Sequence, residues 1–140
     1  MAGGHAGDFL LVRYTATGML DPAFGGDGKV ELDNAGRNDE ARGVLGLDDG
    51  RLAVGGFSSG DFALVVLNGD GSVCPCHVQT AGGTATGAAW LLVDFGGDDV
   101  PYALIRQPDN RLIIGGGARG QDPAQSSFYL ARLSPTASGG

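Results

Sequence analysis

An internal repeat with a period near 60 residues limits the possible folds of this chain more than any other feature. The segment DFLLV at residues 8–12 returns as DFALV at residues 61–65. The segment DGRLAVGG at residues 49–56 returns in the same order as DNRLIIGG at residues 109–116. Self-similarity at such a period is typical of repeat architectures, in which neighbouring units stack to share a core.

Within each repeat, short apolar and β-branched runs bounded by Gly, Asp, Asn and Pro predict strands, and no segment predicts a helix. Turn pairs such as Asp49-Gly50 and Asp109-Asn110 lie between the runs, where tight hairpins need positive φ angles. The expected strands lie near residues 8–14, 28–33, 41–47, 51–57, 61–67, 72–79, 88–94, 101–106, 111–116 and 127–133.

Two of these strands are apolar without alternation, at residues 62–67 and 112–114, so both of their faces must be covered. Hairpin connections argue against a helix-covered parallel sheet and leave sheets stacked face to face. The glycine pairs at 55–56 and 115–116 are expected to end strands where backbones crowd. We therefore expect an all-β fold of antiparallel, four-stranded β-propeller blades. A two-sheet sandwich is the alternative, but it does not explain the period.

The repeat also predicts how the chain is divided. A flexible N-terminus, 1–7, precedes a first propeller repeat at 8–60. A second repeat at 61–126 carries an insertion near 73–90, and residues 127–140 hold the opening strand of a third repeat and a tail.

This division gives about two and a half blades per chain, whereas closed propellers usually have at least four. Apolar faces and strand edges would then be exposed. We expect the chain to be part of a longer repeat chain or a homo-oligomer, with a dimer favoured. In that dimer the strand at 127–133 would complete a blade of the partner, giving five blades from two chains.

The motif order D-F-x-L-x-R-Y-x-x-x-G-x-L-D-x-x-F-G-x-x-G-K-V, from Asp8 to Val30, resembles the delta-60 repeat, a family of tandem bacterial β-propeller repeats. N-D-E-A and D-G-R-L-x-V-x-G follow, and the second copy keeps much of this pattern but departs from it within 73–90. The resemblance implies a secreted or surface-associated repeat protein with no catalytic residues assigned to the repeat. The start of this chain shows no signal peptide.

The charge and hydropathy of the chain limit the classes of partner that we expect it to bind. The net charge is -7 and the few basic residues are scattered, which argues against a nucleic-acid partner. No apolar run approaches the roughly 20 residues of a membrane-spanning helix, so we expect no membrane partner.

Cys74, Cys76 and His77 form the most unusual cluster of side chains. On an extended strand the two cysteines would share a face with Cα atoms about 7 Å apart, at the limit for a disulfide. Reduced structural thiols are the leading interpretation. A soft-metal site, zinc for example, and an oxidised form stay open.

Calcium is a second cofactor to weigh, because acidic turns supply oxygen ligands. The turns are at residues 48–50, 68–71 and 98–99. Hairpin chemistry explains the same residues, so we expect no cofactor, with zinc and calcium as lesser alternatives.

Trp90 and Tyr102 are the candidate ligand-binding residues, since aromatic anchors recur at binding surfaces, although both could pack within blades. The sequence thus predicts a non-enzymatic scaffold or binding surface for protein or glycan. The alternative is a propeller hydrolase or lyase with a central metal. It would need carboxylates or histidines converging on the axis.

Overall fold

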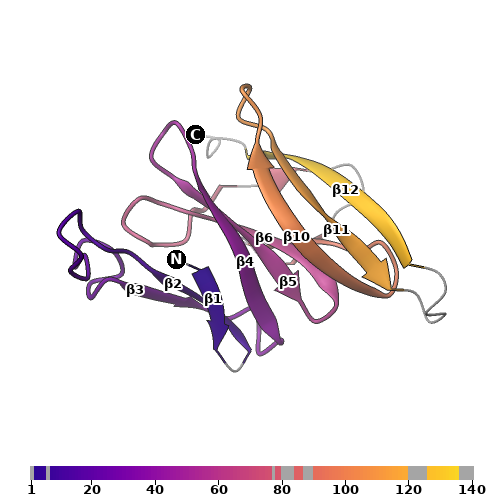
Figure 1. The fold of residues 1–140 in the computed structure, drawn as a ribbon, viewed down its shortest axis with the longest axis horizontal. Coiled ribbons are helices and arrows are strands. Elements are labelled where there is room, and N and C mark those ends of the chain that lie inside the picture. The colour runs from indigo at the N-terminus through magenta and orange to yellow at the C-terminus, as the bar shows by residue number, and fades with distance from the viewer. Residues whose placement is uncertain are drawn as a thin grey trace.

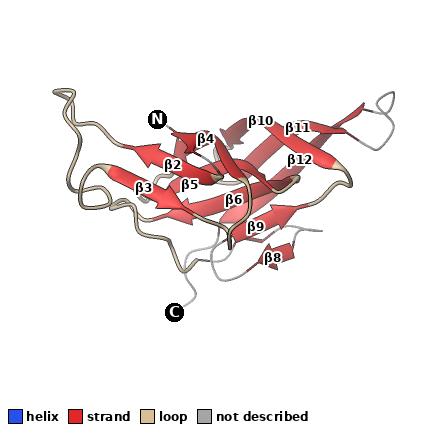
Figure 2. Cartoon of the chain, turned by 90° about the horizontal axis from the view of Figure 1, so that it is seen from below, coloured by secondary structure: helices blue, strands red, loops and turns tan. Residues whose placement is uncertain are grey.

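The structure is a computed structural model that describes residues 2–5, 7–76, 78–79, 84–86, 90–119 and 126–135, with side chains described for 7–76 and 90–119. Within these residues the chain is all-β, and no helix occurs (Figure 2). The strands are β1 (Ala2–His5), β2 (Asp8–Val12), β3 (Lys29–Leu32), β4 (Asp39–Gly46), β5 (Leu52–Ser58), β6 (Asp61–Leu67), β7 (Val78–Gln79), β8 (Thr84–Thr86), β9 (Trp90–Val93), β10 (Asp98–Arg106), β11 (Leu112–Arg119) and β12 (Ser126–Pro135).

These strands form three antiparallel sheets. Sheet 1 has the order β1-β2-β3, sheet 2 the order β4-β5-β6-β9-β8, and sheet 3 the order β10-β11-β12-β7. The main strands of the sheets follow in chain order, from indigo β1 and β2 through purple β4 to orange and yellow β10, β11 and β12 (Figure 1). Strand β7 is the exception, since it lies in sheet 3 but precedes β8 and β9 of sheet 2. Sheet 2 therefore lies between two neighbours.

Strand β6 shows why the apolar runs need cover on both faces. Phe62 and Leu64 point into a core that includes Leu112 of sheet 3. The alternate residues Ala63 and Val65 point into a second core that includes Phe9 of sheet 1. All six side chains are at most 1% exposed. The expectation of face-to-face stacking is confirmed, because each face of the middle sheet is buried against a different sheet.

The boundaries of the sequence repeats do not coincide with the boundaries of the sheets. Strands β2 and β3 of the first repeat close sheet 1, whereas β4 and β5 of the same repeat open sheet 2. The second repeat is divided in the same way, with β6 and β9 in sheet 2 and β10 and β11 in sheet 3. The expected strand at 127–133 lies within β12 and pairs with β11 of its own chain. Backbone hydrogen bonds therefore join each repeat to the next.

The glycine pairs lie inside strands rather than at their ends. Strand β5 continues past Gly56, and β11 continues past Gly116. Each glycine lies beside a register shift in the adjacent strand, between Ala41 and Gly43 and between Pro101 and Ala103. A β-carbon on either glycine would lie 2.0 Å from a carbonyl oxygen of that strand. Backbones do crowd at these glycines, but the close contact is with the adjacent strand of the same sheet and not at a strand end.

The insertion differs most from expectation. Of the strand expected at 72–79, Val73 forms only an isolated bridge to Leu67, and the ladder resumes at β7. Pro75 gives the reason, since proline has no N–H to donate to a neighbouring strand. At the N-terminus, where we expected a flexible segment at 1–7, residues 2–5 form β1 and pair with β2.

Candidate functional site

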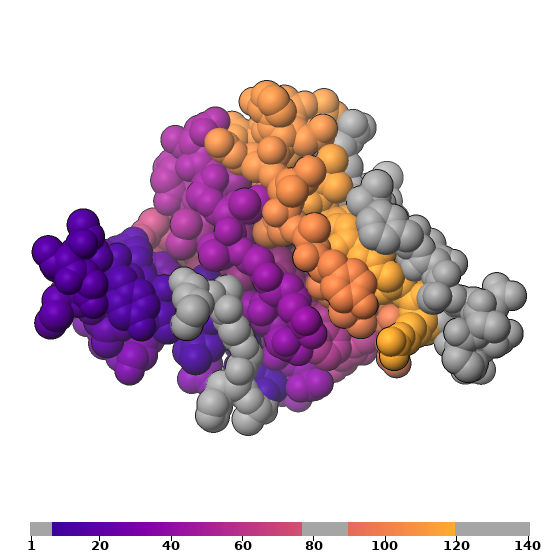
Figure 3. All heavy atoms as spheres, viewed as in Figure 1, coloured from indigo at the N-terminus to yellow at the C-terminus, as the bar shows by residue number. Residues whose placement is uncertain are grey.

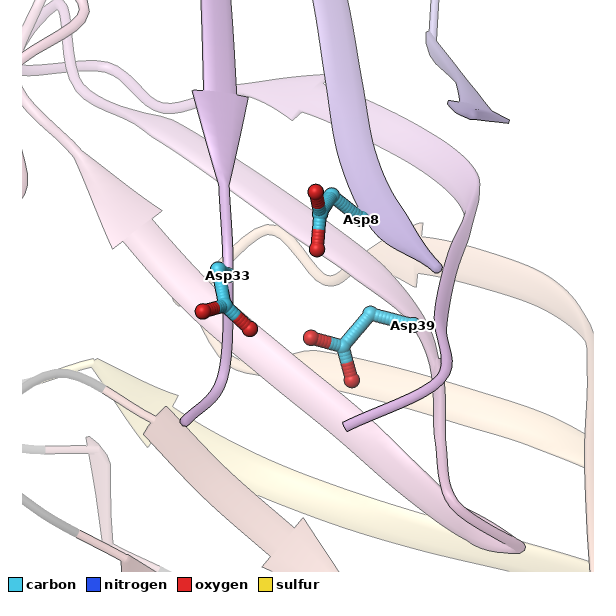
Figure 4. Close-up of side chains that lie close together, drawn as sticks. All are labelled: Asp8, Asp33 and Asp39. Atoms are coloured by element: carbon cyan, nitrogen blue, oxygen red, sulfur yellow. The ribbon is translucent and has the colours of Figure 1, made fainter. Parts of the chain in front are cut away.

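Three aspartates meet where sheet 1 joins sheet 2. Asp8 opens β2, Asp33 directly follows β3, and Asp39 opens β4. Their carboxylates face one another (Figure 4), and one oxygen from each lies within 4.8 Å of the others. We call these residues the first triplet. Asp8 in β2 and Asp33 after β3 come from sheet 1, and Asp39 belongs to β4, the first strand of sheet 2.

Asp39 is the buried member of the first triplet, with 2% of its surface exposed. Its Oδ2 accepts a hydrogen bond from the backbone N–H of Asn34 at 2.7 Å. Its Oδ1 is buried and has no hydrogen-bond partner within the described part of the chain. Burial raises the pKa of the Asp39 carboxyl, the Ser58 hydroxyl and the Asn34 N–H lower it, and the charges of Asp33 and Asp8 raise it further.

The second triplet, Asp61, Asp94 and Asp99, repeats this arrangement where sheet 2 joins sheet 3. Asp99 is fully buried, its Oδ2 accepts the Phe95 N–H at 2.7 Å, and its Oδ1 lacks a partner among the described residues. Burial raises the pKa of Asp99, and the neighbouring charges of Asp94 and Asp61 act in the same direction although the Phe95 hydrogen bond opposes them.

The backbone around the triplets repeats as well. The Asp39 N–H donates to the Gly7 carbonyl at 2.6 Å, and the Asp99 N–H donates to the Gly60 carbonyl at 2.6 Å. In the loops, Asp33 Oδ1 accepts the Gly36 N–H at 2.6 Å, and Asp94 Oδ1 accepts the Gly96 N–H at 2.6 Å. The loop bond spans three residues in the first copy and two in the second, but the partners are otherwise of the same kind, so the triplet is a feature of the repeat unit.

Sequence reasoning missed the triplets although their signal was present. Asp8 and Asp61 open the repeated segments at 8–12 and 61–65, and Asp39 and Asp99 are separated by the same 60 residues as the segments at 49–56 and 109–116. Asp33 and Asp94 complete the two triplets, and each directly follows a strand, β3 and β9 respectively. Carboxylates gathered in this way offer oxygen ligands to a hard cation.

Apart from Asp99, the acidic residues of the turns named from the sequence lie outside the triplets. Asp48 pairs with Arg106 of sheet 3, and Asp49 pairs with Arg51 at 2.7 Å. Asp70 accepts hydrogen bonds from its neighbour Ser72. Asp98 is exposed, and only Asp99 of that turn belongs to a triplet.

Cys74 and Cys76 form a disulfide, which corrects the expectation of reduced thiols. The chain turns at Pro75, so the two Cα atoms lie 5.1 Å apart rather than at the spacing of an extended strand. Both cysteines are buried in the core between sheets 2 and 3. His77, the third residue of the proposed metal cluster, lies outside the described residues.

The two candidate ligand-binding aromatics lie in different sheets. Trp90 in β9 is 9% exposed and packs edge to face on Phe9 of sheet 1, with ring centroids 4.8 Å apart. Tyr102 lies at the bulge of β10 and is 68% exposed. The structure thus places Trp90 in the core between sheets and Tyr102 on the surface.

A pocket lies between the first strands of sheets 2 and 3. Neither a carboxylate nor a histidine occurs among its described lining residues, which include one arginine. They are Arg42, Gly43, Gly55, Pro101, Ala103, Leu104 and Ile114.

Three successive antiparallel sheets, of which the middle one has a core on each face, are typical of an all-β protein of the β-propeller class. Residues 107–136, which include all of β11 and β12, match a protein-family model described as a domain of unknown function (DUF5122) beta-propeller. No curated protein and no solved structure matches the chain. No helix in the described residues has the length and apolar character to cross a membrane.

Proposed function

We propose that the chain is a non-enzymatic β-propeller module of the delta-60 type, completed by self-association, that serves as a scaffold or binding surface for protein or glycan. The match of residues 107–136 to a β-propeller family and the tandem repeat support the class of module.

The observation that carries self-association is the outer face of sheet 3. In sheet 2 the paired residues Leu45 and Ala53 pack into the core shared with sheet 3. Their repeat equivalents, Ile105 and Ile113, pair in the same way on the outer face of sheet 3. There Ile105 is 53% exposed and Ile113 is half-buried. A position that the repeat buries between sheets is thus left open at this end.

At the other end of the stack, the outer face of sheet 1 also carries apolar residues at positions that the repeat buries in sheet 2. Leu10 and Val12 lie on the outer face of sheet 1 and are half-buried. Their equivalents in sheet 2, Ala63 and Val65, are buried against sheet 1. The first strands, in indigo, and the β10 and β11 region, in orange, lie toward opposite sides of the molecule (Figure 3). A second copy would therefore bring the sheet 1 face of one chain against the sheet 3 face of the other, and a two-fold ring of this kind closes.

Two features support a scaffold or binding role over catalysis. The pocket at the first strands of sheets 2 and 3 is lined mainly by glycine and aliphatic residues. Tyr102 projects from the surface beside it, on β10, and an exposed aromatic is a common anchor for a protein or sugar partner.

Multi-angle light scattering and sedimentation of the full chain test self-association. We expect the mass of a dimer for the unmodified chain and a shift to monomer for Ile105→Asp, because a charge on the outer face of sheet 3 opposes apolar contact. Met19→Asp is the matched control. Met19 is 68% exposed in a loop, so the variant should keep the mass of the unmodified chain.

A monodisperse monomer at all concentrations would overturn self-association. So would an Ile105→Asp variant that keeps the dimeric mass. Glycan-array binding that disappears in Tyr102→Ala would support the binding surface, and binding unchanged by that substitution would remove Tyr102 from it.

A further inference from the structure

We propose that each aspartate triplet binds one calcium ion, which links two adjacent sheets. This inference goes beyond the scaffold role and does not depend on self-association.

The donor set and spacing fit calcium. Each triplet offers three carboxylate oxygens within 4.8 Å of one another. Calcium binds oxygen at about 2.3–2.6 Å, so two ligands of one ion lie at most about 5 Å apart. Magnesium demands near-ideal octahedral geometry and usually keeps several of its waters, so a site built from three protein carboxylates favours calcium. Carboxylates without thiol or imidazole select hard ions of this kind.

The second observation is a buried oxygen without a partner in each triplet. Asp39 and Asp99 are at least 98% buried, and each uses Oδ2 for a backbone N–H but leaves Oδ1 unpaired within the described residues. Buried polar atoms in folded proteins are nearly always satisfied, so an unpaired one needs an explanation. Figure 4 shows the Asp39 carboxylate directed toward Asp8 and Asp33, where an ion would lie.

The charges around the two triplets also favour a bound cation. None of the ion pairs formed among the described residues includes an aspartate of either triplet. Arg37 acts at longer range on Asp61, where it opposes the effects of burial and of the Asp94 charge. Three carboxylates held this closely repel one another, and a divalent cation between them would offset the repulsion.

The position of each triplet explains what the ion would do. In the first triplet, Asp8 and Asp33 belong to sheet 1 and Asp39 to sheet 2. In the second, the corresponding boundary lies between sheets 2 and 3. An ion in either place would bridge two sheets that no backbone ladder joins, so calcium would stabilise the stacking of sheets.

The test uses the full chain, stripped with a chelator, and calcium chloride as the probe. Calorimetric titration and native mass spectrometry should give one ion per triplet. Asp39→Asn and Asp99→Asn should each lose one ion or weaken its site by about tenfold or more, because each removes a charged ligand. The double variant should lose both. Asp27→Asn, in an exposed turn, removes the same charge outside the triplets and should keep both ions.

Thermal unfolding provides an independent readout. Calcium should raise the unfolding temperature of the unmodified chain and leave that of the double variant unchanged. In the presence of chelator the order of unfolding temperatures should reverse. The asparagine variants should then be more stable than the unmodified chain, because the repulsion between carboxylates is reduced.

Three results would overturn the proposal. The first is an unmodified chain that takes up no calcium at millimolar concentration, as expected if the carboxylates share a proton instead. The second is ion binding that both asparagine variants retain. Magnesium uptake as tight as calcium uptake would overturn the choice of ion.

Discussion

The ring of Phe62 in sheet 2 lies against Gly116 of sheet 3, with its Cζ 2.8 Å from the point where a β-carbon on that glycine would be. Phe9 of sheet 1 has the same relationship to Gly56 of sheet 2, at 2.7 Å. Both rings are at most 1% exposed. A phenylalanine that fills the space above a glycine of the next sheet is therefore a repeated contact that sets how closely the sheets stack.

Gly116→Ala should destabilise the fold by about 2 kcal/mol or more, because the added methyl group overpacks the contact between sheets. It would meet the Val100 carbonyl oxygen as well as the Phe62 ring. Gly46→Ala in β4 is the control, since no atom lies within 4 Å of its β-carbon position, and it should change stability by less than about 0.5 kcal/mol. Urea unfolding measures both, and equal stabilities would contradict this packing.

Trp90→Ala should cost about 3–5 kcal/mol, because it leaves a cavity beside Phe9 in the core between sheets 1 and 2. Tyr102→Ala should stay within about 0.5 kcal/mol, since its side chain is exposed. Trp90 is the only tryptophan of the chain, so its fluorescence can be followed directly. Emission typical of a water-exposed indole, or easy quenching by acrylamide, would contradict its burial.

The Cys74–Cys76 disulfide can be tested by alkylation. Under denaturing conditions without reductant the chain should gain no adduct, and after reduction it should gain one per cysteine. Because the closed loop is very short, reduction should lower the free energy of unfolding by less than about 2 kcal/mol. Alkylation before reduction would show that the thiols are free.

Much of the fold could be predicted because strand patterns are local. The apolar run in β6 indicated a sheet buried on both faces, and the structure places it between two cores. The turn at Pro75 was missed, because its conformation brings two cysteines together in a way that strand periodicity does not encode. The bulge at Tyr102 depends on the adjacent strand and also lies outside local patterning.

The candidate site was less predictable than the fold. Asp8, Asp33 and Asp39 are separated by turns and by a change of sheet, so sequence spacing alone did not place their carboxylates together. Their equivalence to Asp61 and Asp99 was visible, but as a repeat rather than as a site.

By itself, the sequence determined that this chain is a tandem β repeat whose strands need apolar cover on both sides, because hydrophobic runs and turn residues act over a few neighbouring positions. The tertiary structure alone decided that each repeat is divided between two sheets, and that this division gathers three aspartates at every boundary. The physical reason is that contacts between sheets depend on register and stacking, which join residues far apart along the chain.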